Sequence, residues 1–254
     1  MDGNNKPAIH LPNRFTITFR AGALLAIANI ICAAAIAFAY IRVHTPQKTI
    51  TVVGYAQKDI TSDLIIWSAA VTGNDPDRIK AYEQVQTGMK AALAYLRAHN
   101  ISEDQIQVSS ISSTPNYKRD KNNNPTDQLV SWTLTQGITV TSRDVQKVTD
   151  VSQGITDLIE SGVQIDSGDP EYIYTRLPDL KIVMLASATA DAHTRALQIA
   201  ANSGAALGRL LDAKMGVMQV NPIYSTDVSE EGNNDTSSYQ KTIMAVIHAD
   251  FSLR

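Results

Sequence analysis

The stretch from Thr49 to Val71 reads TITVVGYAQKDITSDLIIWSAAV, and it decides the fold. Its beginning, Ile50 to Tyr55, and its end, Leu64 to Val71, are rich in the β-branched and aromatic residues that favour strands. A polar stretch that contains Asp59 and Asp63 separates the two segments. We therefore expect two strands, joined as a β-hairpin, at the start of a folded domain.

Upstream of these strands, residues 21–41 contain no charged side chain, and Asn29 is the only strongly polar residue among them. A helix of this length rises about 31 Å, which matches the hydrocarbon layer of a bilayer. We therefore expect a transmembrane anchor, or an uncleaved signal, at residues 21–42, preceded by a short cytoplasmic segment at residues 1–20.

The charges beside the apolar segment favour one orientation. Three basic residues, Lys6, Arg14 and Arg20, and one acid, Asp2, precede it, whereas two basic residues follow it over a similar distance. Because basic residues collect on the cytoplasmic side of membrane spans, the N-terminus is predicted to be cytoplasmic.

Two other interpretations of the apolar segment stay open. Ala37-Phe38-Ala39 resembles the small-x-small cleavage pattern of a secretory signal peptide, although the apolar run is longer than the ~7–15 residues of such a peptide's core. A helix buried inside a soluble protein is the other alternative, but an apolar helix of this length would need a larger core than the remaining chain supplies.

Residues 48–254 are expected to form one domain, and its first helix has a clear signature. Asp75-Pro76-Asp77 supplies an N-cap acid, a proline at the first helical position and a second acid in the first turn. The helix is predicted to end at His99-Asn100, where asparagine adopts the left-handed C-cap conformation. The apolar residues expected along one face are Ile79, Tyr82, Val85, Met89, Leu93 and Leu96.

Two further helices follow the same logic. The second is predicted from about Asp144 to Glu160, with Gly162 at its C-cap. The third is predicted from Pro178 to about Leu207 and is rich in alanine, which lets a helix lie close to its neighbour.

The remaining strands are expected to form long hairpins. Strands at Ile106–Tyr117 and Leu129–Thr141 flank a polar loop at residues 118–128, and strands at Gly216–Ser225 and Tyr239–Leu253 flank another at residues 227–238. A short strand is expected at residues 172–176. The predicted fold is α+β, with mainly antiparallel sheets, long hairpins and about three helices after one N-terminal transmembrane helix.

Composition excludes several classes of protein. A net charge of −3 and a pI near 5.9 argue against nucleic acid as a partner. The single cysteine, Cys32, lies in the apolar segment, so neither an intrachain disulfide nor a thiolate metal site is expected.

No catalytic, cofactor-binding or metal-binding residue is assigned, and no cofactor is expected. The nucleophile elbow, the phosphate-binding glycine loop and the HExxH pattern are absent from the sequence. Asp191 and His193 are two positions apart on a predicted helix and point to different faces, so they are not expected to act as a pair. Gly204 and Gly208 are interpreted as a turn out of the third helix.

Two polar loops were weighed as binding sites. Residues 227–235 resemble a calcium loop, with oxygen-bearing side chains at alternate positions and glycine at the sixth, but Ser238 stands where a bidentate glutamate is needed. A solvated acidic hairpin tip is the expected alternative. Lys118, Arg119 and Lys121 are likewise expected to be a solvated cluster, with anionic lipid or partner contact as the other interpretation.

The order of these segments resembles the SIMPL-domain family of bacterial envelope proteins over about Thr49 to Arg254. The first strand, Ile50 to Tyr55, and the alanine-rich run Ala188 to Ala196, with its glycine exit at residues 204–208, carry most of the resemblance. Ser62-Asp63-Leu64 departs from it, because a Pro-Asp pair usually precedes the second strand in the family.

The resemblance implies an extracytoplasmic α+β domain without established catalytic residues. Some members of the family form large rings, and others are linked to oxidative-stress defence. Together with the apolar segment, it implies a single-pass protein of the bacterial inner membrane whose C-terminal domain is periplasmic.

We therefore expect a non-enzymatic, structural envelope protein that self-assembles into a homo-oligomeric ring or cage, tethered to the bilayer through residues 21–41. One alternative is a tethered adaptor or chaperone that binds another envelope protein through the loops at residues 118–128 and 227–238. An enzyme with a dispersed site is the remaining alternative.

Overall fold

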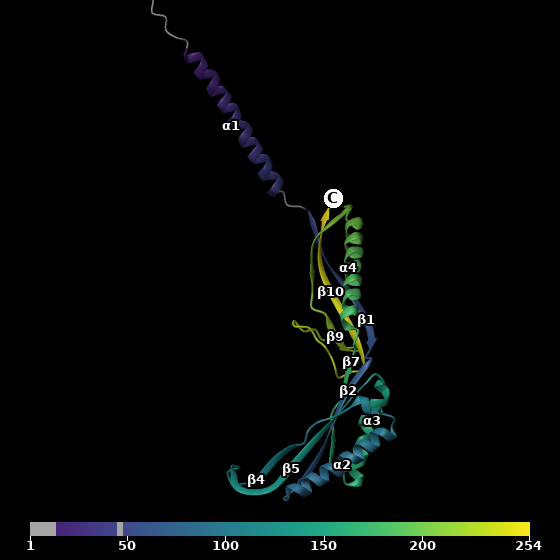
Figure 1. The fold of residues 1–254 in the computed structure, drawn as a ribbon. Helices are drawn as coiled ribbons and strands as arrows, with labels where there is room; N and C mark the ends of the chain where they lie inside the picture. Colours follow the sequence, from purple (N-terminus) through teal and green to yellow (C-terminus); the bar gives the residue numbers. More distant parts are fainter. Residues whose placement is uncertain (1–13, 45–47) are drawn as a thin grey trace, which may run out of the picture. The chain divides into compact units, whose positions relative to one another are not determined.

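The computed structural model describes residues 14–44 and 48–254, and the chain divides after Thr49 into two units. The first unit contains one helix, α1 (Arg14–His44), shown in purple in Figure 1. Its segment Gly22–Ile41 has a mean hydropathy of 2.4 and is unburied. This helix is therefore long and apolar enough to cross a membrane or to act as a signal sequence. The Asn29 amide donates to the Leu25 carbonyl at 3.0 Å, so the helix satisfies its own polar side chain.

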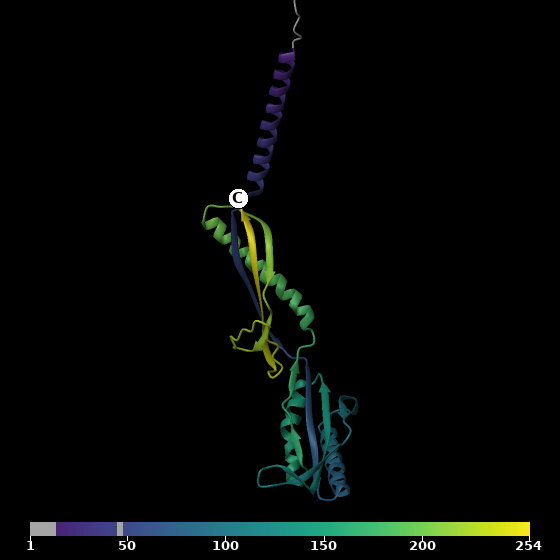
Figure 2. The same cartoon turned by 90° about the vertical axis from the view of Figure 1, so that its left-hand side faces the viewer.

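The predicted hairpin between the first two strands is wrong, because the two strands belong to different sheets. β1 (Thr49–Thr61) lies at the edge of a four-stranded sheet, whereas β2 (Leu64–Asp75) lies inside a six-stranded one. We call the part built on the first sheet the first half of the domain and the part built on the second sheet the second half. β1 and β2 follow one another as a single ribbon through both halves (Figure 2).

Hydrogen bonds hold the junction between β1 and β2 extended. The Ser62 N–H donates to the Tyr239 carbonyl and the Asp63 N–H donates to the Ile173 carbonyl, each at 3.0 Å. Ser62-Asp63 also lacks the glycine that two-residue hairpin turns require. The chain therefore continues from one sheet into the next.

The first half is a sheet with one helix on it. The strand order is β1-β10-β8, with β9 also paired to β10; the bounds are β8 (Leu207–Met215), β9 (Gln219–Pro222) and β10 (Gln240–Leu253). Hydrogen bonds from Thr51 to Asp250 and from Thr242 to Asp59, near opposite ends of the strands, show that β1 and β10 are antiparallel. The helix α4 (Leu177–Asn202) packs along β10 (Figure 1).

The strand β8 was not predicted: Leu207 was placed at the end of the third helix and Gly208 in the turn after it, and residues 209–215 were assigned to no element. α4 ends at Asn202, before the predicted end at Leu207, and Gly204 turns the chain with a φ of 73°. Residues 207–215 read LGRLLDAKM, and most of these residues favour helices. Antiparallel pairing with β10, from Leu253↔Leu207 to Ile247↔Met215, overrides that preference.

The second half is a sheet covered by two helices. Its central strands are β2 and β5 (Pro125–Ser142), and shorter strands pair with them: β3 (Ile106–Val108), β4 (Ser112–Arg119), β6 (Ile165–Ser167) and β7 (Glu171–Ile173). The helices α2 (Arg78–Ala98) and α3 (Val145–Gly154) pack on the sheet, and α3 continues as a 3-10 segment, η2 (Ile155–Ser161). The α+β class with antiparallel sheets is thus confirmed.

The first helix of the domain starts later than predicted and faces differently. The Asp77 side chain, not that of Asp75, caps it by accepting the Ile79 N–H at 2.8 Å. Val85, Met89 and Leu96 are buried as expected. Ile79 and Tyr82, which were expected on the apolar face, are exposed, because the buried stripe of α2 runs through Ala81 and Val85 and leaves both side chains outside it.

Both predicted left-handed caps are confirmed. Asn100 has a φ of 58° and Gly162 a φ of 85°. In each case the next residue closes the helix end, because the Ile101 N–H donates to Leu96 and the Val163 N–H donates to Leu158. Both following side chains are buried.

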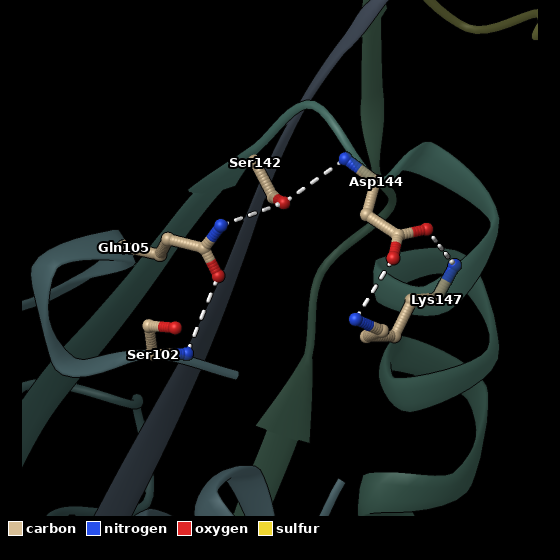
Figure 3. Close-up of polar contacts among 5 residues, drawn as sticks. All are labelled: Ser102, Gln105, Ser142, Asp144 and Lys147. Carbon is tan, nitrogen blue, oxygen red and sulfur yellow. Dashed lines mark hydrogen bonds and ion pairs between the residues drawn. The ribbon is translucent and has the colours of Figure 1, made fainter. Parts of the chain in front are cut away.

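A chain of polar contacts fastens α3 to the end of β5 (Figure 3). The Ser142 hydroxyl accepts the Asp144 N–H and the side-chain amide of Gln105, which lies in the short 3-10 helix η1 (Glu103–Gln105). The Asp144 carboxylate caps α3 by accepting the Lys147 N–H and forms an ion pair with the Lys147 ammonium at 2.8 Å. The helix therefore begins where the strand ends.

Candidate self-association surface

The helix α4 buries only a narrow stripe. Its buried side chains recur at every fourth position: Leu180, Met184, Ala188, Ala192, Ala196 and Ala200. Large apolar side chains lie outside this stripe, including Ile182, which is 71% exposed, Val183, Leu197 and Ile199. These exposed apolar side chains lie along the length of the helix outside its buried stripe, so the outer side of α4 is a candidate contact surface.

Close packing explains why the stripe consists of alanine. A Cβ added to Gly54 of β1 would lie 2.1 Å from the Ala188 carbonyl oxygen and 2.6 Å from the Ala192 Cβ. The helix backbone therefore lies almost directly on the strand, and only small residues fit between them. A helix held this close leaves its longer apolar side chains outside the core.

A groove runs from α4 to the end of β8. It has a volume of about 580 Å³, and its apolar lining includes Ile182, Leu185, Met215 and Val217, with Lys181 and Glu231 also in the lining. β8 pairs only with β10 among the described strands, so its other edge is unpaired. We call the exposed side of α4, this groove and the β8 edge the α4–β8 surface.

The opposite edge of the same sheet is capped. The Tyr55 N–H of β1 donates to the Asp191 carboxylate at 2.8 Å, and Arg195 donates to the same carboxylate oxygen at 2.7 Å. The hydrogen bonds from Tyr55 and Arg195 lower the pKa of Asp191 below its usual value. A charged side chain on an edge strand opposes further strand pairing at that point, and β8 has no such bond from a helix side chain among the described residues.

Asp191 and His193, which were not expected to act as a pair, lie on different sides of α4. Asp191 faces β1, whereas the His193 ring packs edge-on against Phe251 of β10 at 5.8 Å. His99 contacts Tyr95, and His248 is exposed on β10. His10 lies outside the described residues. Cys32 is exposed on α1.

The polar loop after β9 is organised by buried amides. The Gln219 oxygen accepts the N–H groups of Asn233 and Ser229, and the Asn221 amide donates to the Asp227 carbonyl. Gln219 and Asn221 are both buried. The Gln219 side-chain amide also donates to the Ser229 carbonyl. The carbonyls of Asp227 and Ser229 are therefore both hydrogen-bonded to side-chain amides. Sequence reasoning missed this role, although polar residues alternating in a short strand pointed to it.

The calcium interpretation of residues 227–235 gains no support from this geometry. Within residues 14–44 and 48–254, no three histidine, cysteine, aspartate or glutamate side chains are grouped so as to hold a metal ion. The glycine at position 232 has a φ of 90° and serves the turn of the loop.

A buried lysine links the two halves of the domain. The Lys241 ammonium, on β10, donates to the carbonyls of Tyr172 and Asp235. Burial lowers the pKa of Lys241, and the nearby Asp235 carboxylate opposes this effect. Since Tyr172 belongs to β7 of the second sheet, this contact joins the two sheets. The sequence reading missed it because a single lysine in a strand has no distinctive pattern.

The basic cluster lies at a turn shorter than the predicted loop. β4 ends at Arg119 and β5 begins at Pro125, so the turn between them contains only residues 120–124. The Asp120 carboxylate accepts the N–H groups of Asn122 and Asn124, and Asn123 has a φ of 66°. Lys118 and Lys121 make no ion pair with any residue that the structure describes.

Comparison with protein families identifies the family of this chain. The model of a family named SIMPL, described as "Protein of unknown function (DUF541)", matches residues 50–251. No curated protein matches the chain. The matched residues cover almost all of both sheets and α2 to α4. The chain therefore belongs to the SIMPL family.

Proposed function

We propose that this protein is a non-enzymatic envelope protein that is held in the bacterial inner membrane by α1 and self-assembles into a homo-oligomeric ring or cage on the extracytoplasmic side. The observation that carries this proposal is the α4–β8 surface, where large apolar side chains and an unpaired strand edge lie together. A second copy of the same chain is the partner that an anchored domain meets at the highest effective concentration.

The two unlike edges of the first sheet support a closed assembly. Asp191 occupies the Tyr55 N–H of β1, which disfavours pairing between this edge and β8 of the next copy. Contacts between different surfaces of identical chains generate rings when the rotation closes. The absence of open-ended strand pairing favours a defined assembly over aggregation.

The proposed orientation has a cytoplasmic N-terminus and a periplasmic domain. The basic residues before the apolar segment, Lys6, Arg14 and Arg20, support it. In intact cells, a cysteine introduced into the domain would react with an impermeant maleimide, and one introduced at Asn4 would not. The reverse labelling pattern would contradict the orientation.

A tethered adaptor is the second candidate, and one observation favours it. Tyr224, which is 93% exposed and has a φ of 69°, stands on the loop that Gln219 and Asn221 hold in place. An exposed aromatic side chain in a strained conformation is typical of a binding position. Replacing Tyr224 with serine would release a co-purified envelope protein if the adaptor function is correct.

The oligomeric state of the detergent-solubilised full chain tests the proposal. Light scattering is expected to give the mass of several copies, and negative-stain imaging is expected to show closed particles. A clean monomer at a protein concentration of roughly 1 μM or more would contradict self-assembly. A chain that begins at Thr49 shows whether the domain associates without α1.

A further inference from the structure

The strands β4 and β5 continue beyond the rest of the second sheet as a two-stranded arm. β2 pairs with β5 only as far as Asp75↔Trp132, whereas β4 and β5 pair with each other to Arg119↔Pro125 (Figure 1). Residues 116–131 therefore form the arm. An isolated two-stranded ribbon is only marginally stable in water, so this arm needs further contacts.

The arm carries an exposed apolar patch. Tyr117 and Leu129 lie opposite each other across the two strands, and Val130 is the extra residue at a bulge. Tyr117 is 47% exposed, and the other two side chains are also exposed. Cross-strand aromatic and aliphatic pairs stabilise a ribbon, but full burial of this pair requires a covering surface. We call Tyr117, Leu129 and Val130 the arm patch.

An apolar pocket of matching character lies at the base of the arm. Its volume is about 390 Å³, and it is lined by Arg78, Ile79, Tyr82, Ile111, Ser113 and Leu134. Ile79 is 68% exposed. The Ser113 hydroxyl oxygen is buried and has no hydrogen-bond partner. The pocket therefore offers apolar contact together with one polar group that a tyrosine hydroxyl can satisfy.

The arm patch cannot fill the pocket of its own chain. Ser113 and Tyr117 are four residues apart on β4, and an extended strand separates them by about 13 Å. The arm would have to fold back on itself to close that distance. The pocket is therefore open to a side chain from another molecule.

Charge distribution favours a second copy as that molecule. Lys118 and Lys121 beside the arm patch, and Asp75 and Asp77 just before the pocket, form no ion pairs among the described residues. The Asp75 and Asp77 carboxylates accept backbone N–H groups but have no cationic partner in the described part of the chain, so the arm of one copy brings ammonium groups to carboxylates of another that can pair with them. Such complementarity orients an encounter and fixes its register.

We infer that the arm of one copy docks into the pocket of a second copy, with Tyr117 as the anchor, its hydroxyl near Ser113 and its flanking lysines facing Asp75 and Asp77. This inference rests on the proposed self-assembly and adds its direction. Because the arm and the pocket are different surfaces, the contact is head-to-tail, and repetition of a head-to-tail contact closes a ring or continues as a filament.

Cysteine cross-linking between separate copies tests the inference in the full chain. In a Cys32→Ser background, one copy carries Val130→Cys on the arm and a differently tagged copy carries Ile79→Cys at the pocket. Each chain then has one cysteine, so a mixed disulfide forms only between molecules. The matched control pairs Val130→Cys with Ile159→Cys, because Ile159 is also exposed but does not line the pocket.

The mixed dimer of Val130→Cys and Ile79→Cys is expected to exceed the control several-fold, and adding Tyr117→Asp to the arm copy is expected to return it to the control level. Equal cross-linking of both pairs in a protein that still assembles would overturn the arm contact and leave the proposed function standing. A full chain that neither assembles nor cross-links would overturn both. Cross-linking of the arm cysteine to an unrelated protein in cells, without the mixed dimer, would overturn the choice of a second copy.

Discussion

Both halves of the domain pack a helix closely on a strand, but the two cores that result are different. In each, a strand glycine lies under a helix: a Cβ on Gly54 would lie 2.1 Å from the Ala188 carbonyl, and a Cβ on Gly73 would lie 2.3 Å from the Ala81 carbonyl. In the second half, Val85 and Leu134 pack with Ala81 beside this contact, and large side chains such as Trp67 and Leu96 fill the main core of the same half.

In the first half, the helix contributes mainly alanine to the core, and no second helix covers the sheet in the described part of the chain. The apolar residues that would enlarge the core lie outside it, on the α4–β8 surface. The comparison shows that close helix–strand packing alone does not complete a core. If copies associate as proposed, the first half is expected to depend on its partner more than the second half does.

The largest effect is expected from removing the central side chain of the second half. Trp67 is 1% exposed, and its indole N–H donates to Ser167 at 3.0 Å. Trp67→Ala is expected to lower the free energy of unfolding by about 3–5 kcal/mol, because a large cavity remains. Urea unfolding followed by circular dichroism measures this. A loss near that of an exposed site would contradict the account of this core.

Overpacking the strand glycines is expected to have the next largest effect, and it probes the close helix–strand packing that both halves share. Gly54→Ala and Gly73→Ala are each expected to lower the unfolding free energy by about 1–3 kcal/mol, because the added methyl group meets helix backbone. Thermal unfolding provides the measurement. Gly137→Ala is the matched control, since its Cβ would lie 3.4 Å from the Ser109 hydroxyl oxygen. Equal effects at all three positions would contradict the contact.

Removing the lysine that joins the halves is expected to weaken their connection. Lys241→Met leaves the carbonyls of Tyr172 and Asp235 without this donor, which costs about 1–3 kcal/mol. Lys214→Met, on the exposed edge of β8, is the control. Separate unfolding transitions for the two halves in the Lys241 variant would show the lost coupling, and behaviour identical to the control would contradict the link.

The pH dependence of stability provides a second test of Lys241. Its pKa is lowered in the folded protein, chiefly by burial, so the unfolded chain binds the proton more tightly. Stability is therefore expected to rise as the pH increases from the lowered pKa towards the ordinary lysine value. Lys241→Met should remove this rise, which unfolding measured across alkaline pH would detect. A rise that persists in the variant belongs to another group.

The smallest effect is expected at Asp63, in the ribbon between the halves. Burial raises its pKa, but hydrogen bonds from the Thr175 N–H and hydroxyl, with Arg143 nearby, lower it below the usual value overall. The stabilisation is present above the ordinary aspartate pKa and is lost as the pH falls through the lowered one. Asp63→Asn should flatten the acid limb of the stability curve, and Asp127→Asn on the arm should not. An unchanged acid limb would contradict this role.

Sequence patterns predicted the elements whose ends carry local signals. Asn100 and Gly162 marked two helix ends, and the apolar stretch before residue 42 predicted α1. The family was also recognisable from the first strand and the alanine-rich helix. These features depend on residues close together in the chain, so they can be read from it.

Features that depend on distant partners were missed. β8 forms only because β10 lies beside it, and the junction at Ser62 and Asp63 stays extended because of bonds to residues far along the chain. The buried roles of Gln219 and Lys241 likewise depend on loops folded over them. The exposed positions of Ile182 and Ile79 contradict the expectation that apolar residues of an amphipathic helix face the core of their own chain.

The mass of the assembly formed by an α4 variant tests the central claim most directly. Ile182→Asp combined with Leu197→Asp places two charges on the exposed side of the helix, and Ile159→Asp places one on the second half as the control. Light scattering of the full chains in detergent is expected to show smaller particles for the α4 variant and unchanged particles for the control, with thermal unfolding unaltered in both. Particles of wild-type mass from a folded α4 variant would contradict the claim that copies associate through this surface.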